Sequence, residues 1–206
     1  MNLNEKWCYR KIYNIPNLSS IQQELYDFMF SVKPSTDTWI STAMYMSKDK
    51  ISEQTPLFNE YLTSLGIFDR WYYSLLIYTN NGKTLPIHID SAPWKNDRYA
   101  LNIPVYNCDD TYTVWYECEI DYDNNDTIST NVDISAYTNP NYKDKDIPAR
   151  FMKNNSSYKE IERLNSNQPA WVDYTIPHRP VANHNLPRAL FTTRFRPDLS
   201  DIIDKL

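Results

Sequence analysis

The fold is decided by residues 71–90, which read WYYSLLIYTNNGKTLPIHID. The first part, up to Tyr78, is rich in the aromatic and aliphatic residues that favour strands. A Thr-Asn-Asn-Gly turn follows, and a second apolar run extends from Leu85 to Ile89. The two runs predict strands separated by a turn. Because side chains alternate along a strand, His88 and Asp90 are expected to project to the same side.

Four further segments have the composition of short strands. They are Arg98 to Val105, Thr111 to Tyr116, Ala170 to Thr175 and Arg188 to Phe195. Short strands separated by turns rich in Asn, Asp and Pro favour a barrel or sandwich over a parallel α/β sheet. The predicted fold class is therefore α+β and mainly β.

The first seventy residues are predicted to be a helical support for the strands. After a capping sequence at 17–20, apolar residues recur at helical spacing, at Ile21, Leu25, Phe28 and Met29. A second amphipathic run extends from Pro56 to Leu65 and ends at Gly66; its apolar face carries Leu57, Tyr61, Leu62 and Leu65. We expect both helices to pack on one sheet.

The chain of 206 residues is predicted to be a single domain, with barrel strands in 71–118 and 169–196. Between 119 and 157 the sequence becomes polar and irregular. Such a long insertion in a compact domain is typical of a lid, a binding loop or a disordered segment. Residues 119–157 are therefore the candidate for closure over a substrate.

Composition narrows the class of protein. The formal net charge of −5 and the pI near 5.2 argue against nucleic acid as a partner, since a phosphate backbone attracts excess Lys and Arg. No apolar stretch is long enough for a membrane helix. The three cysteines form no CxxC pair, so we expect reduced thiols and a cytoplasmic location. Two glycines beside 17 tyrosines are the bias of an AT-rich genome, such as that of a phage.

The His88–Asp90 pair is a candidate for metal ligation. One further histidine would complete the two-His-one-carboxylate set that suits non-haem Fe(II) and O2. His178 follows a predicted strand and lies ten residues before Arg188. The competitor is His184, which lies four residues before Arg188 in a turn-like stretch. A structural His–Asp hydrogen bond is the alternative reading of the pair.

The last predicted strand carries two candidate anion-binding residues. Period-two alternation places Arg188, Thr192 and Arg194 on one face, whereas the opposite face is mainly apolar and is expected to pack on the helices. Arginine binds carboxylates through its planar fork and stays charged when partly buried. The strand could therefore hold a dicarboxylate; the alternative is that these arginines form surface ion pairs.

Together these features resemble the double-stranded β-helix (cupin-type) Fe(II)/2-oxoglutarate-dependent oxygenases, whose pattern is HxD, a distal His and an Arg about ten residues later. The stretches Leu85-Pro86-Ile87-His88-Ile89-Asp90 and Pro177-His178-Arg179-Pro180 resemble small members near the aspartyl/asparaginyl β-hydroxylases. The similarity covers about 71–116 and 169–196.

The resemblance implies a role for each matching residue. His88, Asp90 and His178 would bind Fe(II), whereas His184 fits the family's His–Arg spacing poorly and is interpreted as a loop histidine. Arg188 would pair with the distal carboxylate of 2-oxoglutarate, Tyr78 would hydrogen-bond the same cosubstrate, and Arg194 and Asn102 are further candidates for contact with it. The reaction implied consumes O2, releases succinate and CO2, and hydroxylates a small molecule, an amino acid or a peptide side chain. Related halogenases lack the carboxylate, so Asp90 favours hydroxylation.

Two other classes remain open from the sequence. A cupin-type metal enzyme that does not use 2-oxoglutarate would keep the three ligands but leave Arg188 and Tyr78 without a role. A non-enzymatic β-sandwich, such as a viral structural or attachment module, would bind no iron, and its His and Asp would serve packing alone.

Overall fold

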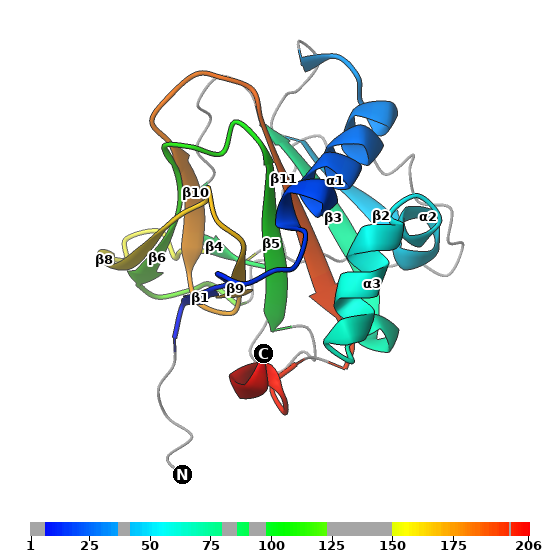
Figure 1. The fold of residues 1–206 in the computed structure, drawn as a ribbon. Helices are drawn as coiled ribbons and strands as arrows, with labels where there is room; N and C mark the ends of the chain where they lie inside the picture. Colours follow the sequence, from blue (N-terminus) through cyan, green and yellow to red (C-terminus); the bar gives the residue numbers. More distant parts are fainter. Residues whose placement is uncertain (1–6, 37–41, 80–85, 91–97, 123–149, 198) are drawn as a thin grey trace.

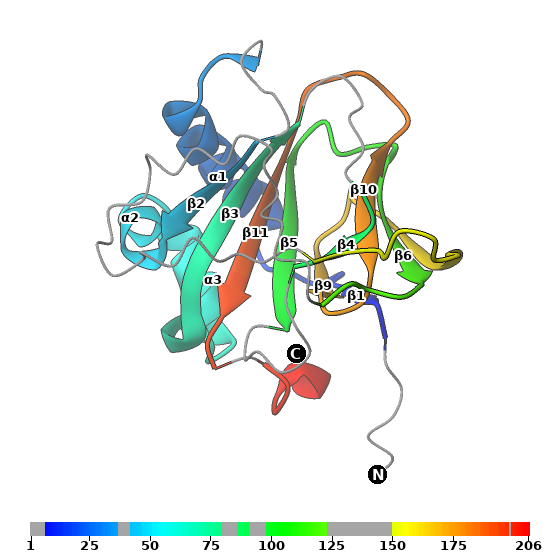
Figure 2. The same ribbon diagram turned by 180° about the vertical axis from the view of Figure 1, so that it is seen from behind.

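The computed structural model describes residues 7–36, 42–79, 86–90, 98–122, 150–197 and 199–206. These residues form two antiparallel sheets, with helices against the outer side of the larger sheet (Figures 1 and 2). The predicted mainly-β class and the helical cover on one sheet are therefore confirmed.

The larger sheet has six strands, and all its pairs are antiparallel. Their order is β1 (Tyr9–Lys11), β9 (Ala170–Asp173), β5 (Tyr99–Tyr106), β11 (Arg188–Phe195), β3 (Trp71–Thr79) and β2 (Thr42–Ser47). The last predicted strand, β11, is thus central and is bonded on both edges. A central position fixes the register of its side chains firmly.

The smaller sheet has five strands and is also antiparallel. Their order is β7 (Arg150–Phe151), β4 (His88–Ile89), β10 (His178–Ala182), β6 (Thr111–Glu117) and β8 (Lys159–Asn165). Strands from distant parts of the chain alternate within this sheet. The sheet therefore brings the two halves of the predicted motif side by side.

The helices are α1 (Leu18–Val32), α2 (Lys48–Ser52) and α3 (Pro56–Ser64), with 3-10 turns η2 (Phe68–Arg70) and η4 (Ile203–Lys205). Helix α1 buries the four apolar residues that its spacing predicts. In α3 the buried residues are Phe58, Tyr61 and Leu62, whereas the predicted Leu57 and Leu65 are only half-buried. The N-terminus of α3 is tied to α1, where the Glu24 carboxylate accepts from the amides of Leu57 and Phe58 at 2.9 and 3.0 Å.

The main core lies between these helices and the larger sheet. Strand β11 contributes Ala189, Phe191 and Phe195 to it, as the period-two alternation predicts. The intervening residues Arg188, Leu190, Thr192 and Arg194 consequently face the space between the two sheets. One strand thus separates an apolar face from a polar one.

The front part of the chain differs from the sequence-based expectation. The first seventy residues contain strands β1 and β2 as well as helices. Both lie at edges of the larger sheet, where pairing with β9 and β3 determines their conformation rather than local propensity.

Of the predicted insertion, residues 123–149 lie outside the described residues, as does the turn at 80–82, whereas 150–151 form strand β7.

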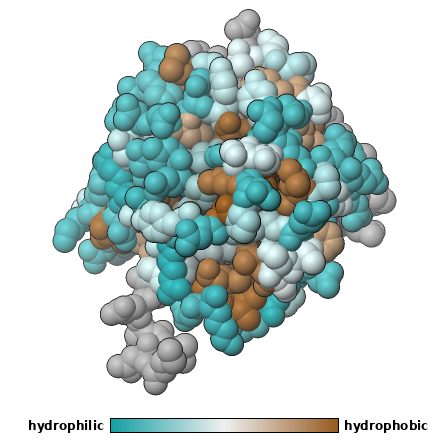
Figure 3. Space-filling view, viewed as in Figure 1, coloured by the Kyte–Doolittle hydropathy of each residue, from teal (hydrophilic) through white to brown (hydrophobic). Residues whose placement is uncertain are grey.

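The surface on the helix-bearing side is mostly hydrophilic, with apolar side chains gathered in its middle and lower parts (Figure 3). No helix in the described part of the chain is long and apolar enough to cross a membrane.

Candidate metal centre

Two histidines from distant parts of the sequence are direct partners across neighbouring strands. His88 on β4 pairs with His178 on β10, and their ring centroids lie 4.7 Å apart. Residues directly opposite in an antiparallel pair project to the same face. The same row continues to Phe151 on one side and Trp115 on the other. Because Trp115 packs in the cluster between the sheets, this row faces the barrel interior.

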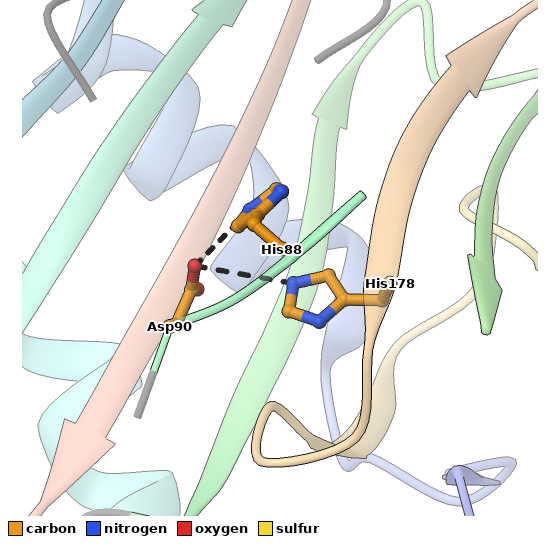
Figure 4. Close-up of side chains that lie close together, drawn as sticks. All are labelled: His88, Asp90 and His178. Atoms are coloured by element: carbon orange, nitrogen blue, oxygen red, sulfur yellow. Dashed lines mark ion pairs between the residues drawn. The ribbon is translucent and has the colours of Figure 1, made fainter. Parts of the chain in front are cut away.

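Asp90 directly follows β4 and completes a cluster of three potential ligands (Figure 4). Its Oδ1 lies 3.2 Å from Nε2 of His88 and 3.9 Å from Nε2 of His178. The ligand atoms of all three residues lie within 4.8 Å of one another. Within the described residues, this is the one group of three histidine, cysteine or carboxylate side chains that could hold a metal ion.

Backbone carbonyls orient both imidazoles. Nδ1 of His88 lies 2.7 Å from the carbonyl of Pro86, and Nδ1 of His178 lies 2.9 Å from that of Ile176. A carbonyl can only accept, so each Nδ1 carries a proton and donates it. Nε2, the remaining nitrogen of each ring, points toward Asp90. This arrangement fixes the tautomer that a metal-binding histidine requires.

The electrostatics of the three residues are strongly coupled. Burial opposes ionisation of Asp90, but the hydrogen bond with His88 and the charge of Arg194 lower its pKa well below the ordinary value. Burial together with the charge of His88 lowers the pKa of His178 to about 3. Burial favours the neutral form of His88, but the hydrogen bond to Asp90, the charge of that carboxylate and the hydrogen bond to the Pro86 carbonyl together raise its pKa above the ordinary value. The carboxylate is therefore charged and His178 is neutral at physiological pH.

A second set of polar side chains lies beside the cluster, on the inner face of the larger sheet. Nη2 of Arg194 donates to Oδ2 of Asp90 at 2.5 Å. The amide of Asn102 donates to the hydroxyl of Tyr174 at 2.7 Å, and Thr192 donates to the Asn102 carbonyl oxygen at 2.9 Å. The Tyr174 ring lies 4.6 Å from the His178 ring and 4.2 Å from the Arg194 guanidinium carbon. The predicted site residues Asn102 and Arg194 are thus brought to the cluster.

Arg188 lies on the same face of β11 and is 3% exposed. Its Nε donates to the Thr79 hydroxyl at 3.2 Å. Among the described residues, no carboxylate forms an ion pair with it, and burial lowers the pKa of its guanidinium. A buried cation without a carboxylate partner is costly, and a bound anion would relieve that cost.

The corner between β9 and β10, which carries Tyr174 and leads to His178, is held by Asp173. The Asp173 side chain is fully buried and accepts from Arg98 Nε at 2.7 Å through Oδ2. Its Oδ1 accepts from the amide and the hydroxyl of Thr175 at 2.9 and 2.6 Å. The Tyr174 carbonyl in turn accepts from the Asp90 amide at 3.1 Å. One corner therefore positions residues near two of the three ligands.

Tyr78 is not part of this site, which corrects the role expected for it. It pairs with Ala189 and therefore projects to the helix side of the larger sheet, where it belongs to the main core. Its hydroxyl donates to the Met29 carbonyl of α1 at 2.8 Å. The sequence left the orientation of β3 open because residues on both faces of that strand are apolar.

His184 and Tyr174 are the remaining points of comparison with the sequence. His184 is half-buried in a loop, where its Nε2 contacts the Asp109 carbonyl at 2.8 Å, so the loop interpretation is confirmed. Tyr174, which the sequence analysis missed, is the aromatic residue beside the cluster. It follows a strand end and has no regular spacing to the histidines, so no sequence signal marks it.

The donor set fits the metal that the resemblance implies. Two imidazole nitrogens and one carboxylate oxygen converge from one side, which is the facial set that suits non-haem Fe(II) and leaves further positions open. The hydrogen bonds from both Nδ1 atoms supply the outer contacts that such ligands need.

Comparison with known proteins identifies the fold. No protein-family model matches the sequence, and the search of curated proteins gives no match. Among solved structures, a prolyl hydroxylase from Trichoplax adhaerens, in complex with a hypoxia inducible factor oxygen degradation domain peptide fragment, matches with a TM-score of 0.50 and 10% identity, over 91% of this chain and 83% of that one.

A second similar structure is the non-haem α-ketoglutarate-dependent epimerase SnoN from nogalamycin biosynthesis, with a TM-score of 0.50 and 11% identity over 91% of this chain and 76% of that one. The same epimerase in complex with Fe3+, α-ketoglutarate and nogalamycin RO matches with a TM-score of 0.50 and 9% identity, over 91% and 78% of the two chains. These similarities extend over most of the chain at low identity. They show that the two facing sheets form a double-stranded β-helix, as the resemblance implies.

Proposed function

We propose that this protein is an Fe(II)- and 2-oxoglutarate-dependent oxygenase. The observation that carries the proposal is the cluster of His88, Asp90 and His178, in which both Nε2 atoms face one carboxylate oxygen inside the barrel. Each imidazole is held in the metal-binding tautomer by a backbone carbonyl. A merely structural His–Asp pair would need neither the second histidine nor this shared orientation.

Arg188 supports 2-oxoglutarate as the cosubstrate. Its guanidinium is buried on the inner face of β11, and no carboxylate among the described residues pairs with it. A dicarboxylate would supply the missing charge through bidentate hydrogen bonds. The Tyr174 phenol is near enough to both Arg188 and Arg194 for their charges to interact with it. The proposed cosubstrate site therefore extends along β11, from Arg188 toward the metal cluster.

Each residue then has a defined task. The bound iron, with 2-oxoglutarate and O2, would supply the oxidising chemistry, which releases succinate and CO2. His88, Asp90 and His178 would hold the metal on one side. Arg188 would hold the distal carboxylate, and Asn102 and Thr192 would supply polar contacts beside it. The apolar residues between the sheets would limit access of water.

The proposed substrate is a small molecule, an amino acid or a peptide side chain, and the proposed reaction is hydroxylation. The similar solved structures include one in complex with a peptide fragment and one in complex with nogalamycin RO, so the fold accepts both classes. The net charge of −5 is unsuited to a nucleic-acid partner. All three cysteines are free thiols, which agrees with the cytoplasmic location that we also propose.

The test is an anaerobic titration of the purified metal-free protein with Fe(II) and then with 2-oxoglutarate, followed by visible absorption. We expect a weak band that requires both additions. The band should be lost in His178→Ala and Arg188→Met. It should persist in His184→Ala, because that histidine lies in a loop away from the cluster.

Three outcomes separate the classes of function. Iron binding together with the band supports the oxygenase. Iron binding without a band at any concentration of 2-oxoglutarate would overturn the oxygenase and favour a cupin-type enzyme that uses a metal alone. Failure of the protein to bind Fe(II) would leave the non-enzymatic β-sandwich as the explanation.

A further inference from the structure

The two carboxylate oxygens of Asp90 have different partners. Oδ1 lies 3.2 Å from Nε2 of His88 and 3.9 Å from Nε2 of His178. Oδ2 instead accepts a hydrogen bond from Nη2 of Arg194 at 2.5 Å. The carboxylate is therefore turned so that one oxygen faces the imidazoles while the other faces the larger sheet. The hydrogen bond from Arg194 therefore restricts rotation of the Asp90 carboxylate.

Among the described residues, Asp90 makes a single backbone hydrogen bond. Strand β4 is two residues long and ends at Ile89, so Asp90 lies beyond its last residue. The described backbone contact of Asp90 is its amide, which donates to the Tyr174 carbonyl at 3.1 Å. That bond fixes the main chain but leaves the side-chain torsions open. The orientation of the carboxylate must come from a side-chain partner.

Arg194 is suited to be that partner because it is itself firmly placed. It lies near the end of β11, which is bonded on both edges, and it is 2% exposed. Its guanidinium carbon lies 4.2 Å from the centre of the Tyr174 ring, and that ring packs 4.6 Å from the ring of His178. Arg194 thus contacts Asp90 directly and reaches His178 on β10 through one buried aromatic ring.

We propose that Arg194 is a positioning residue of the metal centre, which holds Asp90 so that a single oxygen is presented to the metal. This assignment rests on the proposed metal site and changes the role expected for Arg194, from cosubstrate binding to ligand orientation. The distal carboxylate of the cosubstrate would still be bound by Arg188, which makes no ion pair with a carboxylate of the described residues. Of the two arginines on this face of β11, Arg194 therefore orients a metal ligand and Arg188 binds the cosubstrate.

The test compares metal binding with cosubstrate binding in matched variants. Isothermal titration under anaerobic conditions gives the Kd for Mn(II), and then the Kd for 2-oxoglutarate at saturating Mn(II). Arg194→Met should weaken Mn(II) binding about 10- to 100-fold, the usual cost of losing an outer contact to a metal ligand. Its Kd for 2-oxoglutarate at saturating Mn(II) should equal that of the wild type. Arg188→Met should show the opposite pattern.

Two further variants separate orientation from general loosening of β11. Thr193→Val removes the contact at 3.2 Å between the hydroxyls of Thr193 and Ser74, which lies on the opposite face of the strand. It should lower stability without changing the Kd for Mn(II). Arg194→Lys keeps the charge and should recover part of the Mn(II) affinity. The visible spectrum of the Co(II)-loaded protein, which reports coordination geometry, should change in Arg194→Met and not in Thr193→Val.

Each result decides a specific point. Unchanged Mn(II) affinity in Arg194→Met, with 2-oxoglutarate binding weakened as in Arg188→Met, would overturn the inference and leave the proposed function intact. Normal metal behaviour with no 2-oxoglutarate binding by the wild type would overturn the oxygenase and leave the inference intact. A wild-type protein that binds no metal would overturn both. If Arg194→Met does not fold, the same two Kd values of Arg194→Lys decide.

Discussion

His88 and His178 are direct partners across strands β4 and β10, and both rings face the barrel interior. The metal centre is therefore a property of the assembled sheet, since neither half of the chain contains it alone. Each histidine is anchored to its own strand by a carbonyl two residues earlier. Loss of either residue should remove the centre without removing the sheet.

Metal binding should stabilise the folded protein through this pair. At a free Mn(II) concentration of about one hundred times Kd, the free energy of unfolding should rise by about 2.7 kcal/mol. The rise should be absent in His178→Ala and present in His184→Ala. Denaturant unfolding with and without Mn(II) measures it. Equal stabilisation of His178→Ala would show that the metal binds elsewhere.

Replacing Arg188 should separate function from stability. Arg188→Met should weaken 2-oxoglutarate binding by at least about thirtyfold, because losing one partner of a buried charged pair costs about 2–5 kcal/mol. The ligand-free protein should be no less stable, since the variant removes a buried cation that lacks a carboxylate partner among the described residues. Titration calorimetry and denaturant unfolding give the two quantities.

Arg179→Met is a suitable control for that experiment. Arg179 donates to the Tyr116 hydroxyl at 2.9 Å and pairs with Val114, which packs in a separate cluster from the one between the sheets. Its replacement should leave 2-oxoglutarate binding unchanged. A loss comparable to that of Arg188→Met would indicate a general electrostatic effect.

Tyr78→Phe should affect stability alone. The variant leaves the Met29 carbonyl without its hydroxyl donor in the core between α1 and β3. We expect a loss of about 1 kcal/mol in the free energy of unfolding, typical of one hydrogen bond. The Kd for 2-oxoglutarate should not change. A weakened Kd would restore the cosubstrate role first expected for this residue.

The Asp173 corner should couple stability to metal affinity. Asp173→Ala removes the contacts to Arg98 and Thr175, and because Arg98 is partly exposed we expect a loss of about 1–3 kcal/mol. Metal affinity should fall as well, because the corner carries the carbonyl that binds the Asp90 amide. Asp201→Ala, which removes an exposed ion pair with Arg70, should change neither quantity. Denaturant unfolding and calorimetry with Mn(II) test both variants.

Much of the site could be predicted because local rules act on it. The alternation along β11 correctly separates Arg188 and Arg194 from the apolar residues that pack on the helices. The helical spacing of α1 gives its buried face, and the spacing of the histidines from Arg188 distinguishes His178 from His184. The inferences about β11 and α1 depend on short segments whose periodicity is clear, and the choice of histidine depends on the His–Arg spacing of the family that the sequence resembles.

The remainder depends on pairing between distant segments. The cosubstrate-binding role predicted for Tyr78 was wrong. Leu75 and Leu76 make both faces of β3 apolar, so alternation cannot show which face turns inward. Phe151 joins the row beside His88 only because β7 pairs with β4. Edge strands such as β2 form where a neighbour offers unpaired backbone groups, and this is invisible in a single sequence.

Strand β11 has an apolar face and a polar face, and substitutions on the two faces are expected to have different effects. Side chains on its helix-facing side pack in the main core, whereas those on the inner side line the candidate site, where Thr192 contacts Asn102. Substitutions at sites without shared contacts are usually additive in free energy. The face that carries Phe191 could therefore be repacked to obtain a more stable protein, and the inner face could be altered independently to accept a different ligand. Natural selection would have the same two independent routes within a single strand.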